Sequence, residues 1–403
     1  MRRGFLSQYF EGVAVKRLSA VEVNSKVSNQ HEFNGSRQMR KLLGDSRSTF
    51  KARFLWLAEE NEEISSEGSV TWYDARENHP TRSEYRLYFN RNDVMNQAKV
   101  NDMLLVAKKP DETILMILVP KDSTREHQLL WLFGLEEVGF TFNFQPIEDG
   151  YDPEIDFTTR YILEELGIEI NETNEDYLDS ILEPYFKTGF PSTAVFSAFA
   201  RSTIKHVSPN EEPDATLMLW IEQEERLFRR LERHMVSRRL EQGFKTNEGM
   251  DVEAFIQFSL SVHNRRKSRV GYALENHLEE IFKANGILYA RTQVTEHKSK
   301  PDFLFPNAEK YRDSSFPSKG LTMLGVKSTC KDRWRQVLAE ANRIKEKHLL
   351  TLEPAISLNQ TDEMKGSNLR LVLPKQVHAT YRIEQQDWLM DLNSFLLLVR
   401  DRQ

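Results

Sequence analysis

Short apolar runs, often alternating with polar residues, fill the first 145 residues of the chain and predict a β-rich unit. The runs are broken by Gly, Asn, Pro or Asp, which is typical of strands joined by turns. A short helix is expected among them at residues 37–43. A partly open barrel of about seven strands would hold such a set. The predicted strands lie around residues 13–18, 54–58, 69–73, 85–89, 103–107 and 113–119.

The pattern changes at about residue 146, where the chain turns acidic and richer in Pro. Two stretches within residues 146–190, at 157–166 and 174–186, have the spacing of short helices. We therefore expect a structured acidic connector here rather than a flexible tether.

Helical spacing followed by short buried runs marks residues 191–403 and predicts a mixed α/β domain. In the helix predicted at 269–284, Leu274, Leu278 and Ile281 line one face. The order of helices, strands and helices is that of a small mixed sheet with a functional site at one edge. The predicted helices span 217–242, 253–263 and 269–284, and the predicted strands lie around Gln293, Phe303, Met323 and 371–373.

Length and composition narrow the class of protein. With 403 residues, of which 39% are hydrophobic and 29% charged, the chain fits a soluble globular protein of two or three domains. No apolar run approaches the length of a membrane span, and no apolar signal core follows Met1. We expect a cytoplasmic protein with no membrane partner.

Charge and cysteine content exclude a few kinds of site. The net charge of −6 does not favour a general polyanion binder, although acids and bases are segregated along the chain. Cys330 is the one cysteine, which excludes an internal disulfide and a cysteine-rich zinc site.

Candidate chemistry gathers between residues 300 and 340. Asp302 begins one short apolar run and Lys327 ends a second, so an acid and a lysine are expected on neighbouring strands. Residues 334–341 return to helical spacing, and Glu340 lies about a turn from their apolar face. We therefore expect a second acid, Glu340, to lie on this helix and to reach the site of Asp302 and Lys327.

Two carboxylates and a lysine suit metal-assisted cleavage of a phosphodiester. Carboxylates can hold Mg²⁺ while leaving positions for water and phosphate. The ion lowers the pKa of bound water, and a lysine orients that water or offsets charge on the phosphate. A solvated turn followed by a helix-surface acid would give the same pattern, because Pro-Asp is a common turn dipeptide. Tyr311 is a less favoured candidate as a covalent nucleophile, because no arginine pair and histidine are recognisable beside it.

Three motifs make this segment similar to the EcoRII type II restriction endonucleases: PDFLFP at 301–306, KSTCKDRWRQ at 327–336 and NRRKSR at 264–269. The resemblance implies that residues 191–403 form a restriction-endonuclease-like domain of the PD-(D/E)xK type. Many nucleases of this class carry an acid where Val326 is placed by this comparison.

The resemblance also implies the roles of the site residues. In this family a glutamate from the following helix replaces the strand acid, which gives that role to Glu340. Asp302 and Glu340 are then the Mg²⁺ ligands, and Lys327 is the catalytic lysine. Glu275, in the segment SRVGYALE, is similar to a family position that supplies an additional carboxylate.

Lys331, Asp332 and Arg333 follow Lys327 closely and have two interpretations. They can be the first turn of a helix, with Asp near the positive end of the dipole. Alternatively they enter a DNA major groove, where Arg takes guanine and Asp accepts from cytosine N4. The second interpretation is similar to the recognition turn of related nucleases that read CC/GG around a central pair, as in CCWGG.

Two basic segments of the first 145 residues are either solubilising loops or arms that grip a DNA major groove. Both resemble the N-terminal effector domain of the EcoRII family, a DNA-binding pseudobarrel. Pro80 departs from the family, which has a lysine there, so one phosphate contact is absent. By this resemblance the DNA-contacting residues are Lys16, Arg17, His31, Arg82 and Arg86.

The resemblance implies a homodimeric, Mg²⁺-dependent restriction endonuclease with an effector domain at 1–145, a connector at 146–190 and a catalytic domain at 191–403. Docking of the effector domain is expected to cover the catalytic cleft until a second DNA site draws it away. A companion DNA methyltransferase is the expected partner in the same system. The competing hypothesis is a non-cleaving DNA-binding regulator, which would have no need for Lys327.

Overall fold

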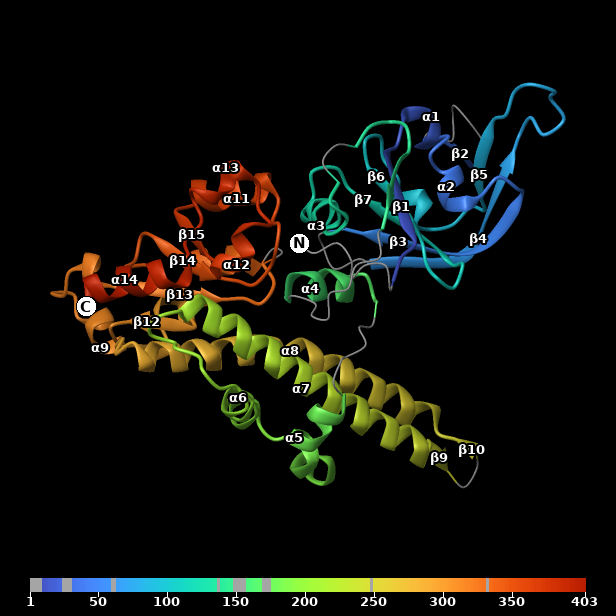
Figure 1. Ribbon diagram of the computed structural model, residues 1–403. Helices are drawn as coiled ribbons and strands as arrows, with labels where there is room; N and C mark the ends of the chain where they lie inside the picture. The colour runs from blue at the N-terminus through green and yellow to red at the C-terminus, as the bar shows by residue number, and fades with distance from the viewer. Residues whose placement is uncertain are drawn as a thin grey trace. The chain divides into compact units, whose positions relative to one another are not determined.

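The computed structural model of the chain describes residues 9–23, 31–58, 63–135, 138–147, 157–168, 175–246, 249–330 and 333–403. The chain divides into two compact units (Figure 1). The first comprises Met1–Leu166 with Ala355–Asn359, and the second comprises Gly167–Pro354 with Gln360–Gln403. The helix α4 (Phe157–Glu165) falls in the first unit and α5 (Glu175–Thr188) in the second.

The first unit is built on a sheet of eight strands in the order β2-β5-β4-β3-β7-β6-β1-β8. The sequence predicted about seven, because the edge strands β2 and β8 have only three and four residues, too few for a periodic pattern. β3 and β7 pair in parallel, and the other neighbours pair antiparallel. The strands are β1 (Gly12–Arg17), β2 (Glu32–Asn34), β3 (Ser48–Leu57), β4 (Glu63–Asp74), β5 (Tyr85–Phe89), β6 (Met103–Lys108), β7 (Ile114–Val119) and β8 (Asn143–Pro146).

Aromatic side chains fill the core of this unit. Phe33 stacks on Phe89 with ring centroids 4.8 Å apart, and Trp72 is fully buried beside Gly35. A Cβ at Gly35 would lie 2.3 Å from the Trp72 ring, so this position requires glycine. The helices here are α1 (Ala20–Val23), α2 (Arg40–Leu43), the 3₁₀ turn η2 (Met95–Gln97), α3 (Thr124–Phe133) and α4.

The second unit places helices before a mixed sheet. The sheet has the order β11-β12-β13-β14-β15, antiparallel from β11 to β13 and parallel from β13 to β15. This confirms the mixed α/β class. The strands are β11 (Ala290–Arg291), β12 (Phe303–Phe305), β13 (Thr322–Val326), β14 (Lys347–Leu350) and β15 (Leu369–Val372), and β9 (Lys245–Thr246) and β10 (Gly249–Met250) form a separate hairpin.

Two long helices, α7 (Pro213–Gln242) and α8 (Val252–Ala284), run side by side (Figure 1). The sequence predicted two helices where α8 is continuous, because charged residues interrupt its apolar pattern. Those charges pair across the helices instead, as in the 2.6 Å contact of Arg266 with Glu232. The other helices of this unit are α5, α6 (Thr193–Ser202), η3 (Glu296–Lys298), α9 (Ala308–Arg312), η4 (Ser318–Gly320), α10 (Trp334–Leu338), α11 (Leu358–Gly366), α12 (Lys375–His378), α13 (Ile383–Gln386) and α14 (Leu392–Arg402).

The C-terminal half of α8 packs against the sheet. Leu274, Leu278 and Ile281 are fully buried, as their spacing predicted. Phe282 meets the ring of Phe303 edge-on at 5.1 Å. The side chains two turns earlier on α8 therefore lie beside β11 and β12 at one edge of the sheet.

Two predicted elements differ from the structure. The strand expected around Gln293 ends at Arg291, and β14, at the centre of the parallel part, was not predicted. β14 begins with Lys347 and His348, which are polar yet 5% and 0% exposed, so tertiary packing overrides the local signal. No helix among the described residues has both the length and the apolar character that a membrane crossing requires.

Candidate active site

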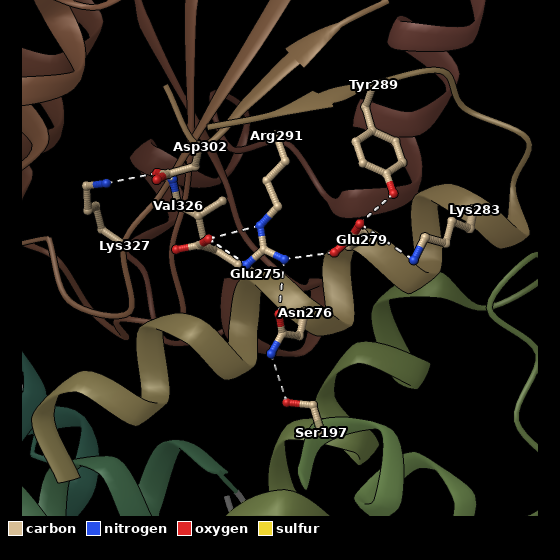
Figure 2. Close-up of polar contacts among 10 residues, drawn as sticks. All are labelled: Ser197, Glu275, Asn276, Glu279, Lys283, Tyr289, Arg291, Asp302, Val326 and Lys327. Carbon is tan, nitrogen blue, oxygen red and sulfur yellow. Dashed lines mark hydrogen bonds and ion pairs between the residues drawn. The ribbon is translucent and has the colours of Figure 1, made fainter. Parts of the chain in front are cut away.

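Asp302 and Lys327 meet at the ends of two neighbouring strands. Asp302 directly precedes β12 and Lys327 directly follows β13, and the register pairs Phe303 with Leu324. The Lys327 ammonium lies 2.9 Å from Oδ2 of Asp302, and the backbone N–H of Val326 donates to the same oxygen at 2.6 Å (Figure 2). The carboxylate is thus fixed through one oxygen, and among the described residues Oδ1 makes no hydrogen bond.

The sequence predicted that Glu340 lies on a helix, and this prediction is wrong. α10 ends at Leu338, and Glu340 lies in the turn that follows. Ala341 takes a left-handed conformation with φ of 49°, which ends the helical run. The ammonium of Lys347 donates to the carbonyl oxygens of Glu340 and Ala341 and so holds this turn.

The site shows why the second acid is absent from β13. In an acid-x-lysine pattern the acid stands two residues before Lys327, which is Gly325, so placing it at Val326 was wrong. A Cβ on Gly325 would lie 2.8 Å from Cγ2 of Val337 on α10. An acid at this position would collide with the helix that precedes Glu340.

The Glu340 carboxyl group is buried among charges. Burial raises the pKa of Glu340 to about 7, with Asp302 adding to the rise and Lys327 and Lys347 opposing it. Its Oε2 atom is buried and has no hydrogen-bond partner. A buried carboxylate oxygen without a donor is an unsatisfied site that a cation would complete.

Glu275 reaches the same region from α8. Arg291, at the end of β11, donates to its Oε2 from Nη2 at 2.8 Å and from Nε at 3.3 Å (Figure 2). Burial raises the pKa of Glu275, the Arg291 hydrogen bond opposes this rise, and Asp302 adds to it. Arg291 was not singled out from the sequence, because a two-residue strand gives no periodic signal there.

This set of donors fits a hard divalent cation such as Mg²⁺. The carboxylates of Asp302, Glu340 and Glu275 each have an oxygen that accepts no hydrogen bond among the described residues. All the atoms available to bind a metal are therefore oxygens, which Mg²⁺ prefers. No three His, Cys, Asp or Glu side chains in the described part of the chain converge closely enough to complete a metal site alone. Water and phosphate oxygens would fill the remaining positions.

Of the three predicted recognition residues, the structure describes Arg333 alone, because Lys331 and Asp332 lie outside the described residues. Arg333 is exposed at the start of α10, and its N–H donates to the carbonyl of Cys330 at 2.7 Å. Cys330 is fully buried, so this hydrogen bond ties the backbone of Arg333 to the core.

Three of the predicted effector residues make internal ion pairs. Lys16 is 3% exposed, pairs with Glu22, and lies 5.3 Å from the centroid of the Phe142 ring. Arg17 pairs with Glu126. In this conformation the Lys16 ammonium is buried and is not accessible to DNA.

Arg86 is likewise paired, at 2.7 Å from both Glu32 and Glu84. His31 and Arg82 differ, since both side chains are exposed. His31 contacts the Phe89 ring edge-on at 5.7 Å. The exposed pair, His31 and Arg82, therefore offers the accessible donors of this set.

Tyr311 is a structural residue in this unit. It is 4% exposed, and its hydroxyl donates to Glu296 at 2.5 Å. Burial together with this hydrogen bond raises the pKa of Tyr311. A buried phenol committed to a carboxylate does not suit the covalent mechanism considered above.

Comparisons with known proteins show what this chain is similar to. Residues 228–396 match the family model described as EcoRII C terminal. The chain is 40% identical over 236 residues to the type II restriction enzyme EcoRII of Escherichia coli, a match that covers 58% of this chain and 56% of that protein. The chain thus spans about half the length of this curated relative.

Two solved structures are similar at lower identity. Metal-depleted Ecl18kI in complex with uncleaved, modified DNA is 16% identical, with a TM-score of 0.44 over 57% of this chain and 84% of that chain. The restriction endonuclease PspGI in its substrate DNA complex is 14% identical, with a TM-score of 0.45 over 54% of this chain and 95% of that chain.

Proposed function

We propose that the protein is a Mg²⁺-dependent type II restriction endonuclease, because residues 228–396 match the EcoRII C-terminal family model. It makes double-strand cuts at a short CC/GG-type site similar to CCWGG. One observation carries the proposal: at the ends of neighbouring strands Lys327 lies 2.9 Å from Asp302, near the buried carboxylate oxygen of Glu340 that has no hydrogen-bond partner.

Asp302 and Glu340 would hold the cation, with Glu275 as a supporting carboxylate. Bound there, Mg²⁺ supplies an activated water and offsets charge on the scissile phosphate. Oδ2 of Asp302 accepts hydrogen bonds from Val326 and Lys327. These bonds fix the carboxylate, so that Oδ1 is oriented as the metal ligand. The Lys327 ammonium, fixed by Asp302, stabilises negative charge that grows on the phosphate in the transition state.

Recognition of the site is assigned to Lys331, Asp332 and Arg333. Arg333 is exposed at the start of α10, and an Arg can donate to guanine O6 and N7 together. Asp332 would accept from cytosine N4, and Lys331 would add a donor. These three residues begin four residues after Lys327. One segment would therefore carry out both base recognition and cleavage.

For the first unit we propose a DNA-binding pseudobarrel that binds a further copy of the site. Exposed His31 and Arg82 support this role. Lys16, Arg17 and Arg86 would join them only by exchanging internal partners for phosphates. Binding of this second copy would relieve inhibition of the catalytic domain by the effector domain.

Assembly and cellular context follow from the proposed reaction. A site that reads the same on both strands requires two equivalent catalytic centres, so we propose a homodimer. Such an enzyme would cut the genome of its own cell unless a companion DNA methyltransferase protected it, so both would act in the cytoplasm. We propose an effector domain at 1–145, a connector at 146–190 and a catalytic domain at 191–403, with α5 of the connector packed in the catalytic unit.

The decisive experiment is digestion of a plasmid with several CCWGG sites, prepared free of methylation. Cutting in Mg²⁺ that stops with EDTA supports the proposal, and end sequencing gives the cut position. The competing regulator hypothesis predicts specific binding of the same DNA without any cutting. Binding without cutting at every Mg²⁺ concentration tested would therefore reject the nuclease proposal.

A further inference from the structure

Arg291 joins the strand beside Asp302 to the helix that carries Glu275. It is the last residue of β11 and pairs in register with Phe303. The next residue, Thr292, donates its N–H to the carbonyl of Asp302 at 3.0 Å. The Arg291 side chain therefore starts from backbone that is hydrogen-bonded to the catalytic strand, and it ends on α8 (Figure 2).

The guanidinium group contacts three residues of one helix face. Nη2 and Nε donate to Oε2 of Glu275 at 2.8 and 3.3 Å. Nη1 donates to Oε2 of Glu279 at 2.7 Å and to Oδ1 of Asn276 at 3.1 Å. A planar fork with fixed donor directions that is held by several partners has little freedom to turn.

The far side of this fork is anchored independently of Glu275. The Tyr289 hydroxyl donates to Oε1 of Glu279 at 2.8 Å, and the Lys283 ammonium lies 3.5 Å from the same oxygen. The Asn276 amide donates to the Ser197 hydroxyl at 3.3 Å. Groups outside the catalytic cluster thus hold the far side of the guanidinium, while its direction toward Glu275 is set by the backbone of β11 and by Asn276.

We propose that Arg291 is a positioning residue that aims the carboxylate of Glu275 at the metal site. It binds one oxygen, Oε2, and leaves the other on the side of Asp302 and Lys327 (Figure 2). Groups that hydrogen-bond a metal ligand from behind fix its orientation and contribute to metal affinity. This inference rests on the proposed function, since it assigns Glu275 to the same site.

A purely structural role for Arg291 makes a different prediction. If the residue only fastens α8 to β11, then breaking either of its carboxylate contacts has the same result. Glu279→Gln weakens the contact on the far side and leaves the Glu275 contact in place. Glu279→Gln is therefore the matched control for Arg291→Gln.

The test is a titration of the full-length protein with Mn²⁺ in the absence of DNA. The electron paramagnetic resonance signal of free Mn²⁺ measures how much of the ion is bound. We expect Arg291→Gln to raise the Kd for Mn²⁺ by about tenfold or more, as for other residues that support metal ligands. Arg291→Lys, which keeps the charge and loses the fork, should give a smaller increase in the same direction. Glu279→Gln should leave the Kd unchanged while lowering the melting temperature.

An unchanged or lower Kd in Arg291→Gln, with melting temperatures like those of Glu279→Gln, would overturn the inference. If Arg291→Gln does not fold, Arg291→Lys decides the question by the same comparison. Failure of the proposed function is a separate result: wild-type protein would bind Mn²⁺ with the predicted dependence on Arg291 and yet cut no DNA.

Discussion

The buried ammonium of Lys347 donates to the backbone carbonyl of Ala341 at 2.6 Å and thereby fixes the turn that carries Glu340. Lys347→Met keeps the length of the side chain but leaves two carbonyls without this donor. Because an unsatisfied buried polar group costs about 1–3 kcal/mol, we expect lower stability and slower cleavage. Chemical unfolding and single-turnover cleavage measure these two effects.

Lys345 supplies the control for this change, because it is exposed and only two residues away. Lys345→Met should leave the unfolding free energy and the cleavage rate unchanged. Equal effects of the two substitutions would contradict a specific role for Lys347.

Lys327→Ala should abolish cleavage while specific DNA binding survives. The ammonium acts on charge that develops in the transition state, and the groove contacts are made by other residues. Gel-shift titration and plasmid cleavage at equal protein concentration test this, with exposed Lys319→Ala as the control. Cleavage by Lys327→Ala at the wild-type rate would reject the assignment of the site.

Arg333→Ala should lower discrimination between the cognate duplex and single mismatches. A bidentate contact with guanine contributes about 1–3 kcal/mol per half-site. Competition binding with mismatched duplexes gives the specificity ratio directly. Arg335→Ala, which removes an exposed pair with Glu363 at 2.8 Å, should keep the wild-type ratio.

Stability should depend on pH through His348, which is fully buried on β14. Burial lowers the pKa of His348 to about 4, so its imidazole stays neutral in the folded protein at pH values where it takes up a proton in the unfolded chain. Its contribution is therefore present above the unfolded pKa of about 6.5 and is lost as the pH falls toward 4. Between pH 7.5 and 5 the loss is on the order of 2 kcal/mol.

Urea unfolding of wild type and His348→Leu at pH 7.5, 6 and 5 checks this prediction. The variant should lose less stability than wild type over this range, by about the amount given above. Parallel curves for the two proteins would show that the imidazole does not take part.

A catalytic fragment should begin at Gly167 rather than near Thr188, the start that the sequence favoured. α5 lies in the second unit, where Leu178 and Leu182 are fully buried and Asp179 pairs with Arg230 at 2.6 Å. Each buried leucine contributes about 1.5–3 kcal/mol, so we expect the shorter fragment to melt at a markedly lower temperature. Calorimetry of both fragments measures this difference, and equal melting temperatures would contradict it.

The contact between Asp302 and Lys327 was predictable because it depends on local signals. Asp302 and Lys327 each border a short apolar run, and runs of this kind become neighbouring strands whose ends meet. Motifs around them supplied the resemblance to a family. The same resemblance assigned Glu340 to the site, and its place in a turn rather than a helix was not predicted.

The rest of the site depends on tertiary contacts that leave no periodic pattern. Arg291 is noteworthy only because α8 places Glu275 and Glu279 opposite it. Lys347 and His348 are polar residues in a central strand, which local propensity does not predict. Ion pairs such as Arg266 with Glu232 likewise keep α8 helical through its charged stretch.

The close approach of Gly325 and Val337 couples positions that are far apart in the sequence. An acid restored to β13 at residue 325 needs a smaller side chain at 337, and it makes the acid at 340 redundant. Gly325→Asp alone should therefore be inactive, whereas Gly325→Asp in a Val337→Ala background has room for the new side chain. In a library that varies residues 325, 337 and 340 together, active sequences with an acid at 325 should carry a small residue at 337, and those sequences alone should tolerate loss of the acid at 340.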